Sequence, residues 1–257
     1  MGKLNKAFIA FLNTFGKKAP RPPVTAAVIV AGGSSTRMGE GKSKQWITVG
    51  GLPVIVHTLI AFDRATTVNE IVLVVKENEQ ALYRGIAEQY GIKKTITLVL
   101  GGDTRQKSAK NGFLACADRV DFVAIHDGAR CLVTPEDIDR VCENAYRSGA
   151  ATAATRVYDT VKLATDSGYI EKTLDRNRVW LAQTPQVFKV AVYHAATAIA
   201  ERDGIAVTDD CSLAEHIEHP VRLVECPATN LKITLPDDIL RAEAILADRA
   251  KKKKEDV

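Results

Sequence analysis

Residues 26–39, with the sequence AAVIVAGGSSTRMG, decide the fold of this chain. Their first six residues form an apolar run typical of a buried strand, and the small residues after it indicate a tight turn. Backbone N–H groups of Gly32 and Gly33 can approach phosphate oxygens closely, while Arg37 and Lys44 add positive charge. The spacing matches neither a Walker A loop nor a dinucleotide fingerprint. The stretch therefore predicts a phosphate-binding loop at the end of a strand.

Beyond this loop, apolar runs of strand length alternate with longer amphipathic runs of helix length. This alternation predicts a Rossmann-like α/β fold, in which a mostly parallel sheet carries helices on both faces. Ligands bind such sheets beyond the carboxyl ends of the strands, and the polar, glycine-rich loops of this chain fall there. We predict further strands at 70–75, 95–100, 122–125, 150–155 and 221–224, and helices at 53–64, 79–90, 104–117, 135–147, 187–202, 209–217 and 236–247.

Residues 156–178 interrupt the alternation. Two short polar runs, 160–164 and 169–174, flank Asp166, Ser167 and Gly168, which is a hairpin signal. A two-stranded hairpin that is polar on both faces is marginally stable by itself. We therefore predict a protruding β-hairpin arm that packs on another subunit.

The positive charge of the chain lies at its two ends. Residues 1–23 hold five Lys/Arg and no acidic residue, whereas the body, 24–250, carries 26 basic and 29 acidic residues. The acidic body argues against nucleic-acid binding. An apolar stripe at helical spacing makes residues 1–23 an amphipathic N-terminal extension, which packs on the body, frays, or binds a membrane surface or a partner. Residues 251–257 are expected to form a solvated basic tail.

Two further observations predict a cytoplasmic protein. The chain has five cysteines without any CxxC spacing. This pattern favours a reducing compartment over a disulfide framework or a zinc site. No stretch approaches the roughly 20 apolar residues that a membrane-spanning helix requires.

Eight segments carry a resemblance to a known family. The first strand with its glycine-rich loop, followed by Lys44 and Gln45, resembles the signature of sugar and polyol phosphate nucleotidyltransferases. The other segments follow at 101–108 (GGDTRQKS), 126–130 (HDGAR), 159–162 (DTVK), 175–177 (DRN), 183–186 (QTPQ), 208–210 (TDD) and 230–234 (NLKIT). Together, over residues 24–249, they resemble the family of 2-C-methyl-D-erythritol 4-phosphate cytidylyltransferases.

The resemblance implies a reaction that transfers CMP from CTP to a polyol phosphate. The acceptor phosphate would attack the α-phosphorus of CTP in line and release pyrophosphate. A phosphate monoester has its second pKa near ~6, so it is largely ionised at pH 7 and needs no general base. Positioning and charge neutralisation remain as the tasks of the protein. Mg²⁺ would be held mainly by CTP phosphates and water, with few protein ligands.

Site residues follow from the same resemblance. The catalytic residues would be Arg37, Lys44, Arg176 and Lys232. The nucleotide pocket would consist of Ala31, Gly32, Gly33, Gly102, Asp103, Ser108 and Ala129. The acceptor pocket would consist of Asp127, Arg130, Thr160, Arg176, Thr208 and Lys232. The family resemblance also implies a homodimer whose arm crosses between subunits, so that Arg176 serves the neighbouring site.

Other interpretations remain open at this point. The acceptor could instead be ribitol 5-phosphate, or the chain could be an inactive homologue that acts as a binding module. Asp103, Thr104 and Ser108 could simply start a helix, as could Asp209 and Asp210, and His126 is expected to be structural. Three positions depart from the family pattern: Ser43 and Cys131 stand where proline is usual, and Gly128 where alanine is usual.

Overall fold

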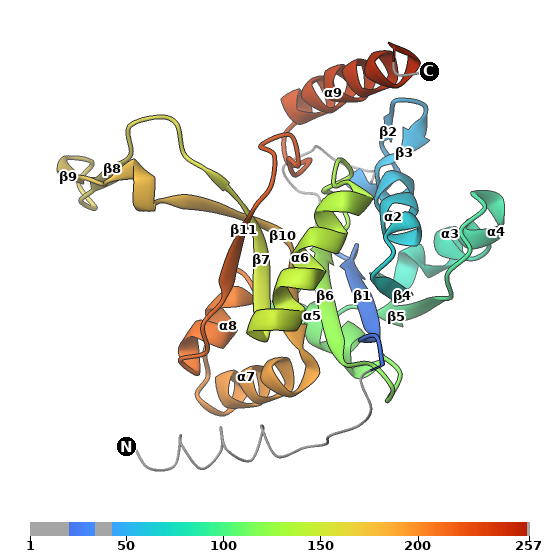
Figure 1. The fold of residues 1–257 in the computed structure, drawn as a ribbon, viewed down its shortest axis with the longest axis horizontal. Coiled ribbons are helices and arrows are strands. Elements are labelled where there is room, and N and C mark those ends of the chain that lie inside the picture. The colour runs from blue at the N-terminus through green and yellow to red at the C-terminus, as the bar shows by residue number, and fades with distance from the viewer. Residues whose placement is uncertain (1–20, 34–42, 256–257) are drawn as a thin grey trace.

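The computed structural model describes residues 21–33 and 43–255, so most of the predicted N-terminal extension, and Arg37 in the glycine-rich loop, lie outside the described residues. A seven-stranded sheet forms the centre of the molecule, in the order β11-β7-β10-β6-β1-β4-β5 (Figure 1). β1 pairs in parallel with both β4 and β6, and β10 alone runs antiparallel to its neighbours. This confirms the mostly parallel sheet. The strands are β1 (Thr25–Val30), β4 (Val68–Val75), β5 (Ile96–Leu100), β6 (Phe122–Asp127), β7 (Ala150–Arg156), β10 (Trp180–Lys189) and β11 (Arg222–Glu225).

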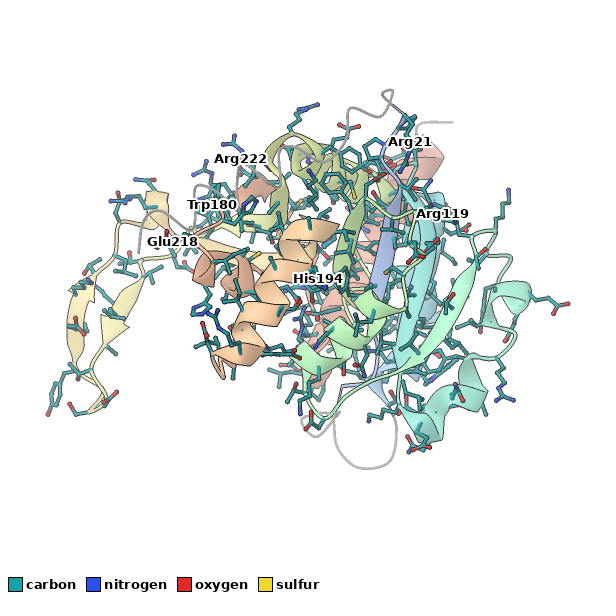
Figure 2. The ribbon with its side chains drawn as sticks, turned by 90° about the horizontal axis from the view of Figure 1, so that it is seen from below. Arg21, Arg119, Trp180, His194, Glu218 and Arg222 are labelled. Carbon is teal, nitrogen blue, oxygen red and sulfur yellow. The ribbon has the colours of Figure 1, made fainter. Side chains whose placement is uncertain are left out.

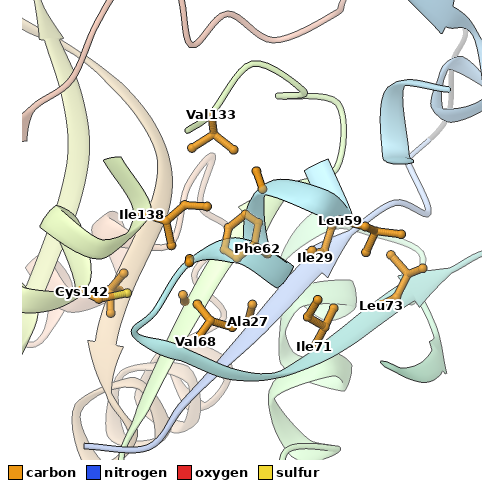
Figure 3. Packing of buried hydrophobic residues seen from close by; sticks show 14 of the residues in the cluster. Ala27, Ile29, Leu59, Phe62, Val68, Ile71, Leu73, Val133, Ile138 and Cys142 are labelled. Carbon is orange, nitrogen blue, oxygen red and sulfur yellow. The ribbon is translucent and has the colours of Figure 1, made fainter. Parts of the chain in front are cut away.

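Helices cover both faces of the sheet, as expected from buried parallel strands. Successive residues of β1 explain why, since Ala27 and Ile29 pack into one hydrophobic cluster and Val28 and Val30 into another. The first cluster, part of which is drawn in Figure 3, lies under α2 (Val54–Arg64), α3 (Gln80–Tyr83), α4 (Ile86–Gln89) and α6 (Pro135–Ser148). The second lies under α5 (Arg105–Leu114), α7 (Val190–Arg202) and α8 (Cys211–His216).

Helix α5 packs closely on the sheet at Gly112. A Cβ added to Gly112 would overlap Val28 Cγ1 of β1 and lie 2.7 Å from Val74 Cγ2 of β4. Only glycine therefore permits this approach of helix to sheet. The first turn of α5, capped by the Thr104 side chain, is held at the edge where β1 and β6 end.

A third, smaller cluster lies between α9 (Pro236–Glu255) and the loop that follows β6. It includes Val49 from a small hairpin, β2 (Thr48–Val49) and β3 (Leu52–Pro53), and Ile233 from the segment before α9. Two short 3-10 helices are also present: η2 (Lys44–Trp46) precedes β2, and η3 (Glu77–Glu79) follows β4. The final helix continues through Glu255, so residues 251–255 of the predicted tail extend α9.

The arm is the part of the molecule that stands away from the body. It contains β8 (Lys162–Ala164), β9 (Ile170–Thr173) and the 3-10 helix η4 (Arg176–Arg178), and Figures 1 and 2 both show it projecting from the sheet. β8 and β9 pair antiparallel, with Gly168 at φ +85° in the turn. The hairpin prediction is therefore confirmed.

Two predicted elements were wrong. The helix expected at 79–90 is broken into η3, α3 and α4, because Gly85 adopts a left-handed conformation with φ +77° between α3 and α4. The helix expected from residue 187 begins at Val190, since Val187 and Phe188 are still paired with β6 and β7. Strand β10 was not predicted at all.

Among the described residues, no helix is long and apolar enough to cross a membrane.

Candidate functional site

The functional segments gather at one edge of the sheet. β1, β5, β6 and β11 run in the same direction, so the loops after their carboxyl ends meet there. The loop after β1 carries Gly32, that after β5 carries Gly102, and that after β11 carries Lys232. This edge is where an open α/β sheet binds its ligands.

Asp127, the last residue of β6, lies at the centre of the site. Its side chain is 11% exposed, and both carboxylate oxygens are paired. Arg105 Nε donates to Oδ1 over 2.9 Å, and Lys232 Nζ donates to Oδ2 over 2.7 Å. Arg130 Nε lies 3.9 Å from Oδ2. The structure therefore brings three predicted acceptor-pocket residues together around one buried carboxylate.

Arg105 connects this carboxylate to a second one. Its Nη1 donates to Asp210 Oδ2 over 2.7 Å, and the other oxygen of Asp210 accepts a 2.8 Å hydrogen bond from Tyr193. Gln186 of β10 accepts hydrogen bonds from the backbone N–H groups of Asp210 and Cys211. These contacts fix the turn at 208–210 against the end of β6.

Arg130 and Asn230 connect the loop after β6 with the segment before α9 and with β10. Arg130 Nη1 donates to the Asn230 carbonyl over 2.8 Å, and Asn230 Nδ2 donates to the Thr184 carbonyl over 3.0 Å. Arg130 Nε is buried without a hydrogen-bond partner among the described residues. Its nearest charged neighbour is the Asp127 carboxylate, 3.9 Å away, so this donor adds positive charge to the cluster.

His126 is structural, as predicted. Its ring is fully buried between Thr184 Oγ1, 2.9 Å from Nδ1, and the Arg130 carbonyl, 3.3 Å from Nε2. Burial lowers the pKa of His126 to about 3 despite the neighbouring Asp127 carboxylate. A neutral imidazole with its proton on Nε2 satisfies both contacts, so the ring supports the loop instead of transferring protons.

The charges of the cluster determine its protonation. Burial alone would raise the pKa of Asp127, but Arg105 and Lys232 outweigh it and hold that pKa below the ordinary range. The pKa of Arg105 is likewise raised above its ordinary value, because Asp210 and Asp127 overcome the burial that would lower it. Asp127 is therefore ionised near neutral pH. Arg105, Arg130 and Lys232 together exceed the charge of Asp127 and Asp210 by one, which favours an anionic ligand.

The predicted nucleotide segments flank this cluster. Ala31 is buried and its N–H donates to the Val74 carbonyl over 2.8 Å, while Gly32 and Gly33 follow toward the surface. The Gly102 N–H donates to Ser108 Oγ over 3.0 Å, and a Cβ at Gly102 would lie 2.5 Å from Lys107 Cβ. The buried Ala129 carbonyl accepts from Ile233 N–H. Asp103 is exposed and pairs with Lys107.

Lys44 begins the 3-10 helix η2 in a half-buried position at the far end of the glycine-rich loop. The next residue, Gln45, is buried, and Trp46 packs on Tyr83 with ring centroids 4.9 Å apart. These contacts anchor the turn that carries Lys44.

Two predicted site residues lie on the arm instead of beside Asp127. Thr160 is exposed, and Arg176 Nη1 donates to the Tyr158 carbonyl over 2.7 Å within the arm. Thr208 is exposed in the turn before Asp209 and Asp210. The structure thus brings together Asp127, Arg130 and Lys232, with Thr208 beside the turn that Arg105 holds, but it does not bring Thr160 and Arg176 to them.

Sequence reasoning missed the roles of Arg105, Gln186 and Asp210. All three lie in motifs that were recognised, but their charge and amide groups point to partners more than 20 residues away in the chain. Asp209 does act as a helix-start residue, since it accepts from the Ser212 N–H, whereas Asp210 is buried and paired with Arg105. Only the topology of the sheet reveals that Asp210 and Asp127 share one arginine.

The three departures from the family pattern leave the charges in place. A Cβ on Gly128 would lie 3.0 Å from Ile55 Cδ1 and 3.1 Å from Gln45 Oε1, so the glycine accommodates a closely packed neighbourhood. Cys131 is buried, and burial raises its pKa to about 11. Ser43 immediately precedes η2.

Comparisons with known proteins agree on one family. The family model described as 2-C-methyl-D-erythritol 4-phosphate cytidylyltransferase (IspD) matches residues 25–248. A protein of that name from Syntrophus aciditrophicus is 42% identical over 225 residues, covering 87% of this chain and 96% of the relative. One from Pelotomaculum thermopropionicum is 41% identical over 225 residues, covering 87% and 94%.

A solved structure supports the same likeness. The 4-diphosphocytidyl-2C-methyl-D-erythritol synthase from Anaerococcus prevotii superposes with a TM-score of 0.80 at 30% sequence identity. The match covers 88% of this chain and all of the solved chain.

Proposed function

This chain belongs to the 2-C-methyl-D-erythritol 4-phosphate cytidylyltransferase family, and from that premise we infer its reaction. It transfers CMP from CTP to 2-C-methyl-D-erythritol 4-phosphate, which gives 4-diphosphocytidyl-2-C-methyl-D-erythritol and pyrophosphate. The reaction belongs to the non-mevalonate pathway of isoprenoid precursor synthesis. Relatives that are similar over almost their whole length favour this acceptor over ribitol 5-phosphate, and they favour an active enzyme over an inactive homologue.

The observation that carries this function is the charged cluster around Asp127. A polyol phosphate offers hydroxyl groups, which donate to a carboxylate, and a dianionic phosphate, which needs cations. Asp127 provides the carboxylate, and Arg130 and Lys232 lie beside it. The surplus positive charge of the cluster matches such an acceptor.

CTP binds beside this cluster in our proposal. Gly32 and Gly33 let the backbone after β1 approach the triphosphate, and Arg37 and Lys44 neutralise charge that develops at the α-phosphate. Gly102, Asp103 and Ser108 contact the cytidine from the loop after β5, and Ala129 contacts it from the loop after β6. A methyl group at Gly102 would collide with Lys107, so the glycine lets this loop pack on the first turn of α5.

Mg²⁺ enters with CTP in this proposal. Both oxygens of Asp127 are already paired with cationic side chains, so that carboxylate is a poor metal ligand. In the described ranges there is no group of three or more His, Cys, Asp and Glu side chains that could hold a metal ion. A Mg²⁺ ion bound by triphosphate oxygens and water fits these residues and would neutralise phosphate charge.

We further propose a homodimer in which the arm completes the neighbouring site. Tyr169 and Ile170 are 76% and 66% exposed on the arm, although both are large and partly or wholly apolar. A two-stranded hairpin gains stability when such side chains are covered. Thr160 and Arg176 would then face the acceptor in the partner subunit. A cytoplasmic location fits the free thiols of all five cysteines.

The test is pyrophosphate release with CTP and Mg²⁺, offered 2-C-methyl-D-erythritol 4-phosphate or ribitol 5-phosphate in parallel. We expect a strong preference for the methylerythritol phosphate in kcat/KM. Preference for ribitol 5-phosphate would overturn the acceptor assignment but leave the nucleotide site intact. No release with either acceptor, from a folded protein that binds CTP, would favour the inactive homologue.

A further inference from the structure

Arg105 is the side chain that joins the two halves of the acceptor pocket. It belongs to the first turn of α5, directly after the predicted nucleotide segment. Its guanidinium lies between the end of β6, which carries Asp127, and the turn that carries Thr208 and Asp210. The side chain is 26% exposed, and its two partners are 11% and 1% exposed.

The geometry of the two contacts requires an arginine. Nε binds Asp127 at 2.9 Å while Nη1 binds Asp210 at 2.7 Å, so one planar group holds two carboxylates from different loops. A lysine in this place presents a single charged atom and cannot reproduce that fork. Tyr193 and Gln186 fix Asp210 from the other side.

We propose that Arg105 is a positioning residue that fixes Asp127 and the turn at 208–210 relative to each other, so that the acceptor pocket exists before the acceptor binds. This inference rests on the proposed function, because it concerns the same acceptor. The role proposed for Arg105 is carried by its Nε and Nη1 donors, both of which are directed at carboxylates.

A second consequence concerns Lys232. Its side chain is 36% exposed and pairs with Asp127, yet in the proposed reaction it serves a phosphate. When Lys232 turns to the phosphate, Asp127 loses one of its two close cations. Arg105 remains bound to Asp127 and keeps the buried carboxylate ionised and oriented. Without Arg105, Asp127 and the phosphate would compete for the same lysine.

The test compares Arg105→Met and Arg105→Lys with wild type. For Arg105→Met we expect KM for 2-C-methyl-D-erythritol 4-phosphate to rise by about 10- to 100-fold, the range of lost charge-assisted hydrogen bonds. The dissociation constant of CTP, measured by calorimetry without acceptor, should stay within about 2-fold, the scatter of independent sites. Arg105→Lys should restore part of the loss, because it returns the charge without the fork.

A double-mutant cycle tests whether Arg105 acts through Asp127. The pair Arg105→Met and Asp127→Asn should lose less in kcat/KM than the two single losses combined, because part of the effect of Arg105 passes through Asp127. The matched control is Arg119→Met, which breaks an arginine–carboxylate pair with the largely buried Glu70, and it should leave KM unchanged. Figure 2 shows Arg119 on the body, well apart from the arm.

Three results would overturn the inference: an unchanged KM for the acceptor, an equal loss of CTP affinity, or strictly additive effects in the cycle. A readout without activity separates this inference from the proposed function. In wild type and in Arg105→Met, the pKa of the Asp127 carboxyl can be followed by carbon NMR in the absence of substrates. We expect the variant to have the higher pKa, and an unchanged pKa would overturn the role of Arg105 even if the enzyme used another acceptor.

Discussion

The charged cluster around Asp127 and the arm differ in how many of their contacts come from this chain. Asp127 is paired with Arg105 at 2.9 Å and with Lys232 at 2.7 Å, and its carboxylate is almost fully buried. On the arm, Arg176 bonds only a backbone carbonyl among the described residues, and large side chains such as Tyr169 lie in solvent. The first region is organised by one polypeptide, whereas the second has side chains that gain few contacts from residues 21–33 and 43–255. The difference fits the proposed homodimer, in which a second subunit would cover the arm.

The largest effect is expected from the nucleotide side of the body. Lys44→Met should lower kcat by about 100- to 1,000-fold, because a charge that stabilises the transition state is lost from a positioned site. The measurement is steady-state pyrophosphate release, with folding checked by circular dichroism. Lys110→Met, which removes a surface pair between Lys110 of α5 and Glu201 of α7, serves as the control and should retain activity. Near-normal turnover in Lys44→Met would remove Lys44 from the mechanism.

The next effect tests the arm. Arg176→Ala should lower kcat/KM for the acceptor by about 100-fold, as expected for loss of one charge-assisted contact to a phosphate. The control, Arg178→Ala, changes the other arginine of the same 3-10 helix and should be nearly silent. Mixing Arg176→Ala with Lys44→Ala should restore part of the activity, because one hybrid site receives both wild-type residues. Subunit exchange without any recovery would contradict an arm that crosses between subunits.

A third prediction concerns the pH dependence of stability. The pKa of Asp127 is held below its unfolded value of about 3.9. The stabilisation that the ionised Asp127 carboxylate gives the folded state is therefore complete above the unfolded pKa. It is lost as the pH falls through the lower folded pKa. Asp127→Asn should reduce the free energy of unfolding by about 2 kcal/mol near neutral pH, with the difference shrinking below about pH 4. Urea unfolding from pH 3 to 7 measures it, and parallel curves at every pH would exclude an ionised Asp127 as the cause.

A smaller effect is expected at the surface of the arm. Ile170→Glu places a charge on an exposed apolar position of β9 and should weaken dimerisation by about 10-fold. Glu171→Gln, at the neighbouring position on the opposite face of the strand, is the control. Sedimentation equilibrium measures the dissociation constant. An unchanged constant would place the subunit contact elsewhere.

The smallest effect should follow removal of residues 1–23. Arg21 pairs with Asp121 over 2.9 Å, but both side chains are about two-fifths exposed, and such pairs contribute little. We therefore expect unchanged turnover with CTP and acceptor in the shortened chain. A large loss would show that this extension belongs to the site or to the fold.

Sequence reasoning succeeded for elements whose signals lie within their own residues. The apolar run of β1 and the capping residue Thr104 predicted their structures correctly, because strand burial and helix starts have local signals. It failed at β10, where Gln183, Pro185 and Gln186 interrupt the apolar pattern of a strand. Gln186 is buried there because it binds the turn at 209–211. The residues next to Gln186 in the sequence do not predict a partner so far along the chain.

The same limit applies to the site. The motifs predicted Asp127, Arg130 and Lys232 for one acceptor pocket, and the structure places these three side chains near one another, while their role toward the acceptor stays a prediction. They did not predict Arg105 as its central cation, because the pairing depends on where α5 lies on the sheet. The relation of Thr160 and Arg176 to the acceptor stays a prediction, since it depends on a second chain.

The tight packing of Gly112 makes the chemistry of the site sensitive to a substitution at this distant position. Arg105 lies seven residues before it on α5, about 10 Å along the helix axis. A methyl group at position 112 would have to displace the helix from β1 and β4, and Arg105 would move with it. A variant such as Gly112→Ala could keep every charged residue and still lose the bridge between Asp127 and Asp210. In a survey of random variants, this glycine should therefore behave like a member of the active site although it contacts no ligand.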